Sequence, residues 1–203
     1  MQAFDVDERD SRWERHDPRY RLYTFDSGGV TRTVDLVDAS LRDAMWSGEI
    51  AGRSGMLWSL ALVVDDTALG RGLTWISGLD YHDTPSTPAM WRERAVMQDR
   101  WLSASGRSDP PTLPDGKRVI RLSCDHGVEW PLQESSTAEH TRTPEELGVS
   151  GALRDRLRSW LESFHAGETD EAWTAEGERL HGLLQEEVAA VAEVRSAFAP
   201  GMR

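Results

Sequence analysis

The sequence predicts an α+β fold in which a small antiparallel sheet carries helices on one face and the chain ends in an antiparallel helical hairpin. Two β-rich runs flank a Gly-Gly turn between residues 20 and 37, which is the pattern of a β-hairpin. An uncharged apolar run of strand length follows at residues 56–64. Apolar side chains then recur at helical spacing between residues 149 and 198. This order of elements favours an antiparallel sheet with segregated helices.

The C-terminal hairpin is the most regular stretch of the sequence. The apolar stripe of its first helix consists of Leu153, Leu157, Trp160, Leu161 and Phe164. Gly167 is expected to end this helix, because glycine enters the left-handed conformation without steric cost. Thr169 or Asp170 is expected to cap the second helix, which should run on through Phe198. A connection this short places the two helices side by side and antiparallel.

The middle of the chain supplies the remaining elements. A short helix is expected after Asp38 or Ser40, bounded by Gly48 and Gly52. A strand should cover residues 73–79, and Lys117 to Cys124 should form another.

A longer helix is expected over residues 88–103, with Thr87 as its N-cap. Arg94 and Gln98 fall within its apolar arc, so they either extend along its edge, which the sequence favours, or reach a buried carboxylate. Thr143 and Glu146 have the spacing of a capping box.

Composition shifts divide the chain into four parts. Residues 1–17 are charged and predict a mobile arm. Residues 18–104 form the α+β sheet domain, and the Ser-, Pro- and Gly-rich residues 105–116 form a linker or a long loop. Residues 117–203 contain a strand and the helical hairpin. Whether this last part packs as one domain with the first is left open by the sequence.

Charge and composition narrow the classes of partner. The chain has 203 residues and a formal net charge of −12, which argues against general affinity for nucleic acid or anionic lipid and favours basic partners. Cys124 is the only cysteine, so no intrachain disulfide can form, and a reducing, cytoplasmic location is expected. No apolar run approaches the roughly 20 residues that span a membrane. The 9 tryptophans are dispersed along the chain, which predicts a shared core rather than a stacking platform.

One group of candidate site residues follows the strand expected at 73–79. Asp80, His82 and Asp83 place a histidine between carboxylates. This pattern suits a metal ligand set or a general base, but three polar residues before a proline-rich turn also suit hydrogen bonds within the turn. Both interpretations remain open from the sequence.

A second group lies at the end of the strand expected at 117–124. Cys124 and His126 would share one face of the strand, and together they could form a nucleophile or two ligands of a zinc site. Asp80, His82 and His126 are the candidate metal ligands. A lone buried cysteine also serves simply as a small apolar side chain.

The sequence has no P-loop, no GxGxxG after a strand, no GxSxG and no CxxC. No motif therefore requires a cofactor.

The part of the chain from 118 to 198 resembles a group of uncharacterised proteins from high-GC Gram-positive bacteria. The resemblance is carried by RVIRLSCDHGVEWPL at 118–132, ELGVSGALRDRLRSWLESF at 146–164 and WTAEGERLHGLLQEEV at 173–188. It implies a strand, a glycine turn, a Trp-Pro-Leu segment and the helical hairpin. The group has no assigned activity, so it implies no catalytic residue.

Three functional hypotheses follow from these observations. The leading one is a cytoplasmic binding protein, of a regulatory, immunity or assembly type, that acts through protein–protein contacts, with a homodimer also open. The alternative is a metal-assisted or Cys/His hydrolase that uses His82, Asp83, Cys124 and His126. The third is an acidic mimic of DNA, which requires carboxylates spaced like phosphates along one face.

Overall fold

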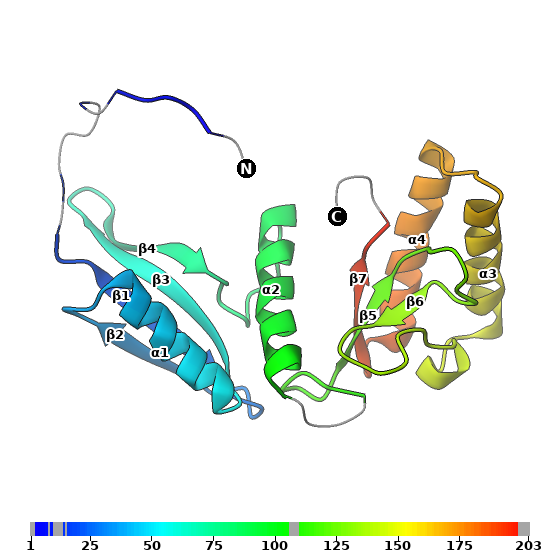
Figure 1. Cartoon of the computed structure of the whole chain (residues 1–203), viewed down its shortest axis with the longest axis horizontal. Coiled ribbons are helices and arrows are strands. Elements are labelled where there is room, and N and C mark those ends of the chain that lie inside the picture. Colours follow the sequence, from blue (N-terminus) through cyan, green and yellow to red (C-terminus); the bar gives the residue numbers. More distant parts are fainter. Residues whose placement is uncertain (1–2, 8, 10–13, 15, 106–109, 199–203) are drawn as a thin grey trace.

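Two β-sheets lie on either side of a central helix in the computed structural model of the chain, which describes residues 3–7, 9, 14, 16–105 and 110–198 (Figure 1). Part of the arm predicted at 1–17, including Trp13, lies outside these residues. The α+β class is as predicted, with an antiparallel four-stranded sheet, a three-stranded sheet and four α-helices in the described part. The elements, in chain order, are β1 (Arg19–Phe25), β2 (Thr31–Leu36), α1 (Leu41–Arg53), β3 (Leu57–Asp66), β4 (Gly70–Ser77), α2 (Pro88–Ser105), β5 (Arg118–Leu122), β6 (Leu132–Glu134), the 3-10 helix η1 (Glu145–Leu147), α3 (Gly151–His165), α4 (Glu171–Val188) and β7 (Ala192–Ser196).

The first sheet has the strand order β2-β1-β3-β4 and is antiparallel throughout. The predicted β-hairpin is confirmed as β1 and β2, with Tyr20 opposite Leu36 and Phe25 opposite Thr31. The apolar run at 56–64 becomes β3, which lies between β1 and β4. Because alternate residues face opposite sides, Tyr20 and Leu22 point toward α1 while Phe25 packs with α2 on the other side. The two sides of the sheet therefore pack against different helices.

Helix α1 begins at a capping box and passes very close to the sheet. Ser40 is the cap, and Ser40 and Asp43 exchange the two hydrogen bonds of the box. Gly48 and Gly52 lie inside this helix and do not bound it, so that prediction is wrong. Both glycines face the Trp58 ring, and a Cβ built on Gly48 would lie 2.3 Å from Trp58 Cε3. These glycines allow α1 to lie close to the sheet; they do not end the helix.

This packing predicts opposite effects for two helical glycine-to-alanine changes. Alanine is favoured over glycine in a helix interior by about 1 kcal/mol. We expect Gly182→Ala in α4 to stabilise the protein by up to about that amount, because nothing lies within 4 Å of the new Cβ. We expect Gly48→Ala to destabilise it by about 1–3 kcal/mol, because the Cβ overpacks the Trp58 ring. Urea unfolding of the two variants measures both signs, and a stabilising Gly48→Ala would contradict the close approach.

Helix α2 joins the two sheets through a shared apolar cluster. Its predicted cap is confirmed, since the Met90 backbone N–H donates to Thr87 Oγ1 at 3.2 Å. Met97 and Trp101 of α2 pack with Phe25 of the first sheet and Val119 of β5. The described end of the Ser-, Pro- and Gly-rich segment also packs here: Leu113, 2% exposed, belongs to the same cluster.

The second sheet has the order β6-β5-β7. Its strand β7 shows that the last helix is shorter than predicted. Helix α4 ends at Val188, and the residues predicted to continue it form β7, which pairs in parallel with β5. Ile120 stands opposite Val194 in this pairing, whereas β5 and β6 are antiparallel. No local pattern predicts this parallel pair, because its two strands are separated by the whole helical hairpin.

The helical hairpin itself forms as predicted and covers the second sheet (Figure 1). Asp170 caps α4, accepting the Trp173 backbone N–H at 2.9 Å, and Gly167 takes a φ of 83° after α3. The capping box of Thr143 and Glu146 is also present. The apolar faces of both helices meet β5, β6 and β7 in one core, whose buried members are Ile120, Leu122, Leu132, Leu147, Leu153, Leu157, Trp160, Trp173, Leu180, Leu184, Val188, Ala192 and Val194.

Candidate functional site

The His82 group lies in the loop between β4 and α2, where its members bond to the loop and to the first sheet. His82 Nε2 is 2.8 Å from Thr31 Oγ1, and the His82 ring meets the Phe25 ring edge-on at 5.4 Å. Asp80 Oδ1 accepts the His82 backbone N–H at 3.1 Å, and the Asp80 carbonyl accepts the Asp83 backbone N–H at 3.0 Å. These are the turn-stabilising hydrogen bonds that the sequence left open as one interpretation.

The second group lies at the other end of the molecule, in the turn after β5. Cys124 is half-buried against the core of the helical hairpin, and burial raises the pKa of its thiol to about 12. Since the thiolate is the nucleophile, this environment opposes covalent catalysis by Cys124. The His126 ring packs on Phe164 at 5.1 Å and on His165 at 5.8 Å, both at the end of α3.

His82 and His126 therefore contact different elements. The partners of His82 belong to β1 and β2, whereas those of His126 belong to α3, on the opposite side of α2 (Figure 1). Within the described ranges, no group of three or more His, Cys, Asp or Glu side chains is arranged to hold a metal ion. The geometry brings neither the joint hydrolase site nor the set of Asp80, His82 and His126 together.

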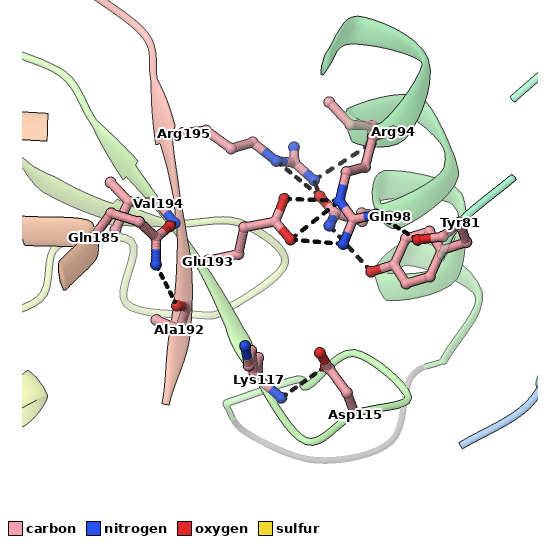
Figure 2. Close-up of polar contacts among 11 residues, drawn as sticks. Tyr81, Arg94, Gln98, Asp115, Lys117, Gln185, Ala192, Glu193, Val194 and Arg195 are labelled. Atoms are coloured by element: carbon pink, nitrogen blue, oxygen red, sulfur yellow. Dashed lines mark hydrogen bonds and ion pairs between the residues drawn. The ribbon is translucent and has the colours of Figure 1, made fainter. Parts of the chain in front are cut away.

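A polar network connects α2 to β7 (Figure 2). Figure 2 shows Arg94 and Gln98 of α2 pointing toward Glu193 and Arg195 of β7. Arg94 Nη2 lies 3.2 Å from Glu193 Oε2, and both side chains are 15% exposed. Arg94 thus reaches a carboxylate, so the favoured prediction that it extends along the helix edge is wrong. The same guanidinium stacks over the Tyr81 ring at 4.0 Å and donates to the Tyr81 carbonyl at 2.7 Å.

Gln98 and Arg195 form the second half of this network. Gln98 is fully buried; its amide oxygen accepts from Arg195 Nη2 at 2.6 Å and its amide nitrogen donates to the Tyr81 hydroxyl at 3.2 Å. Arg195 Nη1 also donates to Asp99 at 2.9 Å, and burial raises the pKa of Tyr81. Each charged member has a partner of opposite charge, so the network fixes α2 against β7 rather than offering a reactive group.

A cleft of about 660 Å³ lies on the other side of α2, between α2 and α1. Its wall is mainly apolar, including Met45, Met56, Trp58 and Val96, and Arg100 of α2 is its half-buried cation. No motif in the sequence identified Arg100 as a candidate site residue, because its surroundings depend on which strands lie beneath α2.

The outer edge of the first sheet is the other exposed feature. β4 is eight residues long, and in the described part of the chain it pairs with β3 alone. Its residues are exposed from Gly70 to Ile76, including three large apolar side chains, Leu73, Trp75 and Ile76, at 36–39% exposure. The register leaves Ile76 unmatched between Trp75, opposite Ala61, and Ser77, opposite Leu60.

Comparison with known proteins adds no relative. The chain matches no family model, no curated protein and no solved structure. The resemblance of residues 118–198 to proteins of high-GC Gram-positive bacteria therefore stays a prediction. Over the described residues, no helix is both long and apolar enough to cross a membrane.

Proposed function

We propose that this protein acts by binding another protein and that the partner adds an extended segment to the free edge of β4. The observation that carries this proposal is the exposed β4 edge with its large apolar side chains. Strand addition uses the unpaired backbone groups of an edge strand for affinity and alternate side chains for specificity. Tryptophan is also enriched among the residues that dominate binding energy, and Trp75 lies in the middle of this edge.

The β4 edge has few of the features that usually protect an exposed strand. Natural edge strands are blunted by lysine, by proline or by a covering segment. β4 contains no proline and one charged residue, Arg71, whose guanidinium is bonded to Asp65 in β3. The bulge at Ile76 twists the strand but leaves that side chain exposed.

The opposite edge of the same sheet is the natural comparison. β2 alternates polar residues such as Thr31, Thr33 and Asp35 with Val34 and Leu36, which are half-buried. β2 therefore offers no exposed large apolar row, although its backbone edge is equally unpaired in the described residues. The net charge of −12 favours a partner of positive charge, because opposite fields speed encounter.

Site-specific photo-crosslinking tests this proposal. A photo-reactive phenylalanine analogue at position 75 should give a covalent adduct in the cells that express the protein. The variant Leu73→Lys with Ile76→Lys should lose that adduct, because lysine on an edge strand opposes pairing. The matched β2 variant, Thr33→Lys, should keep it.

The adduct mass also separates the two kinds of partner. An adduct of twice the chain mass identifies a second copy, and any other mass identifies a different protein. An adduct that survives both lysines of β4, or a protein that stays a free monomer in every sample, would remove the support for this function.

A further inference from the structure

The α1–α2 cleft contains a half-buried cation, Arg100, that has no counter-ion among the described residues. Arg100 Nη1 donates to Ser77 Oγ at 2.8 Å, and Nη2 donates to the Trp58 carbonyl at 3.2 Å. Both acceptors are neutral, and Arg100 Nε is buried without a hydrogen-bond partner. The guanidinium also lies 4.0 Å from the centre of the Trp58 ring. In the described part of the chain, Arg100 forms no ion pair.

The other half-buried arginines in the described part of the chain each form an ion pair with an acidic side chain. Arg118 and Arg142 both bond to Glu134, Arg94 bonds to Glu193, and Arg195 bonds to Asp99. Burying a charge without a partner is costly, and an arginine stays protonated in proteins. Burial accordingly lowers the pKa of Arg100, and the charges of Glu93 and Glu49 only partly oppose this. An anion from outside the chain would relieve the cost.

The residues that line the cleft indicate the chemistry of the rest of the anion. Met45, Met56, Val96 and Trp101 supply apolar surface, and the volume of about 660 Å³ suits a small organic molecule. Methionine side chains are flexible, so Met45 and Met56 can adapt the shape of the cleft to a ligand. Glu49, Asp99 and the exposed Arg53 also line the cleft. The two carboxylates outnumber Arg53 and would repel a doubly charged group such as a phosphate more strongly than a single carboxylate.

We propose that the cleft between α1 and α2 binds an organic monocarboxylate with an aromatic or branched apolar body, and that Arg100 receives the carboxylate. This site is separate from the β4 edge, and its ligand is independent of the protein partner. Arginine recognises carboxylates through charge-assisted hydrogen bonds, which are about twice as strong as neutral ones.

Matched acid and amide probes test the charge requirement. Indole-3-propionate and 4-phenylbutyrate are titrated into the full chain beside their primary amides, and binding is followed by calorimetry and by the ¹H–¹⁵N signal of the arginine Nε groups. We expect the acids to bind and to shift the Arg100 signal, and the amides to bind at least about tenfold more weakly. Equal binding of acid and amide overturns the proposal, and so does a failure of every acid to bind, the free peptide C-terminus included.

Substitutions of Arg100 and Glu49 test whether Arg100 is the residue that recognises the carboxylate. Arg100→Met should remove the preference for acid over amide, and Arg100→Lys, which keeps the charge, should retain part of it. Glu49→Gln should leave binding intact or tighten it by removing a repulsive carboxylate. If Glu49→Gln instead shifts the Arg100 Nε signal as strongly as the acids do, Glu49 is the counter-ion in solution and the proposal fails. The acid–amide comparison needs only the unaltered chain, so a misfolded Arg100 variant leaves the test decisive.

A peptide C-terminus offers the same chemistry as a free acid. A tripeptide ending in leucine is therefore titrated with a free and with an amidated C-terminus. Binding of the free peptide but not of indole-3-propionate assigns the source to a protein terminus, and the reverse assigns it to a small metabolite. Either result supports an apolar monocarboxylate at Arg100.

Discussion

Glu134→Ala should destabilise the protein by about 3–5 kcal/mol, which is the cost of breaking a buried ion pair from one side. The Glu134 side chain is 1% exposed and lies in β6. Its Oε1 and Oε2 accept from Arg118 Nε and Nη2 at 2.8 and 2.6 Å, and Oε2 also accepts from Arg142 Nε at 2.6 Å. Removing the carboxylate leaves two largely buried guanidinium groups without their shared acceptor. Urea unfolding measures the loss.

Two comparison variants separate charge burial from a general effect of truncation. Glu178→Ala, on the exposed face of α4, should change stability by no more than about 0.5 kcal/mol. Replacing all three charged residues by apolar ones of similar size, Glu134→Leu with Arg118→Met and Arg142→Met, should recover most of the loss. If Glu134→Ala costs no more than Glu178→Ala, the three charged groups do not form the buried cluster described above.

Trp160→Ala should cost a similar amount, about 3–5 kcal/mol, because a large buried aromatic is removed and a cavity remains. Trp160 of α3 and Trp173 of α4 stack at 4.7 Å between ring centres. Each indole N–H donates to the backbone carbonyl of the other tryptophan, at 3.0 and 3.1 Å. Gly177 makes room for the pair, since a Cβ there would lie 2.7 Å from Trp160 Cζ2.

The exposed Trp46 supplies the control for this prediction. Trp46 is 50% exposed on α1, so Trp46→Ala should change stability by no more than about 0.5 kcal/mol. Trp160→Phe keeps a ring but loses the donor to Trp173, and it should fall between the two, losing at least about 1 kcal/mol. Chemical unfolding measures the free energy of unfolding of the three variants. Near-ultraviolet circular dichroism reports the loss of the stacked tryptophan pair. A Trp160→Ala variant as stable as Trp46→Ala would show that this pair does not hold the two helices together.

The dispersal of tryptophan along the chain predicted a shared core. Some of the tryptophans are buried as predicted, and others are exposed. Trp58, Trp101, Trp130, Trp160 and Trp173 are buried at 9% exposure or less, whereas Trp46, Trp75 and Trp91 are 37–50% exposed. The pattern of the sequence could not separate these two groups. Burial of a tryptophan depends on which elements pack against its own element, and that is set only when the chain folds.

The sequence by itself determined the features that depend on a few neighbouring residues. The β1–β2 hairpin, the cap at Thr87, the capping box at Thr143 and the glycine stop after α3 all appear where they were predicted. Turn and cap geometry uses hydrogen bonds between residues two to four positions apart, so local identity is sufficient to predict it.

The tertiary structure decided the features that join distant residues. Residues 192–196 become a strand because β5 offers them an edge, although their spacing also suited a continued helix. Arg94 meets Glu193 across 99 positions. Among the described residues, Arg100 bonds to the neutral acceptors Ser77 and Trp58 and forms no ion pair. The strand order likewise leaves the β4 edge unpaired among the residues that the structure describes. Long-range pairing brings such groups together or keeps them apart, and no local pattern in the sequence encodes it.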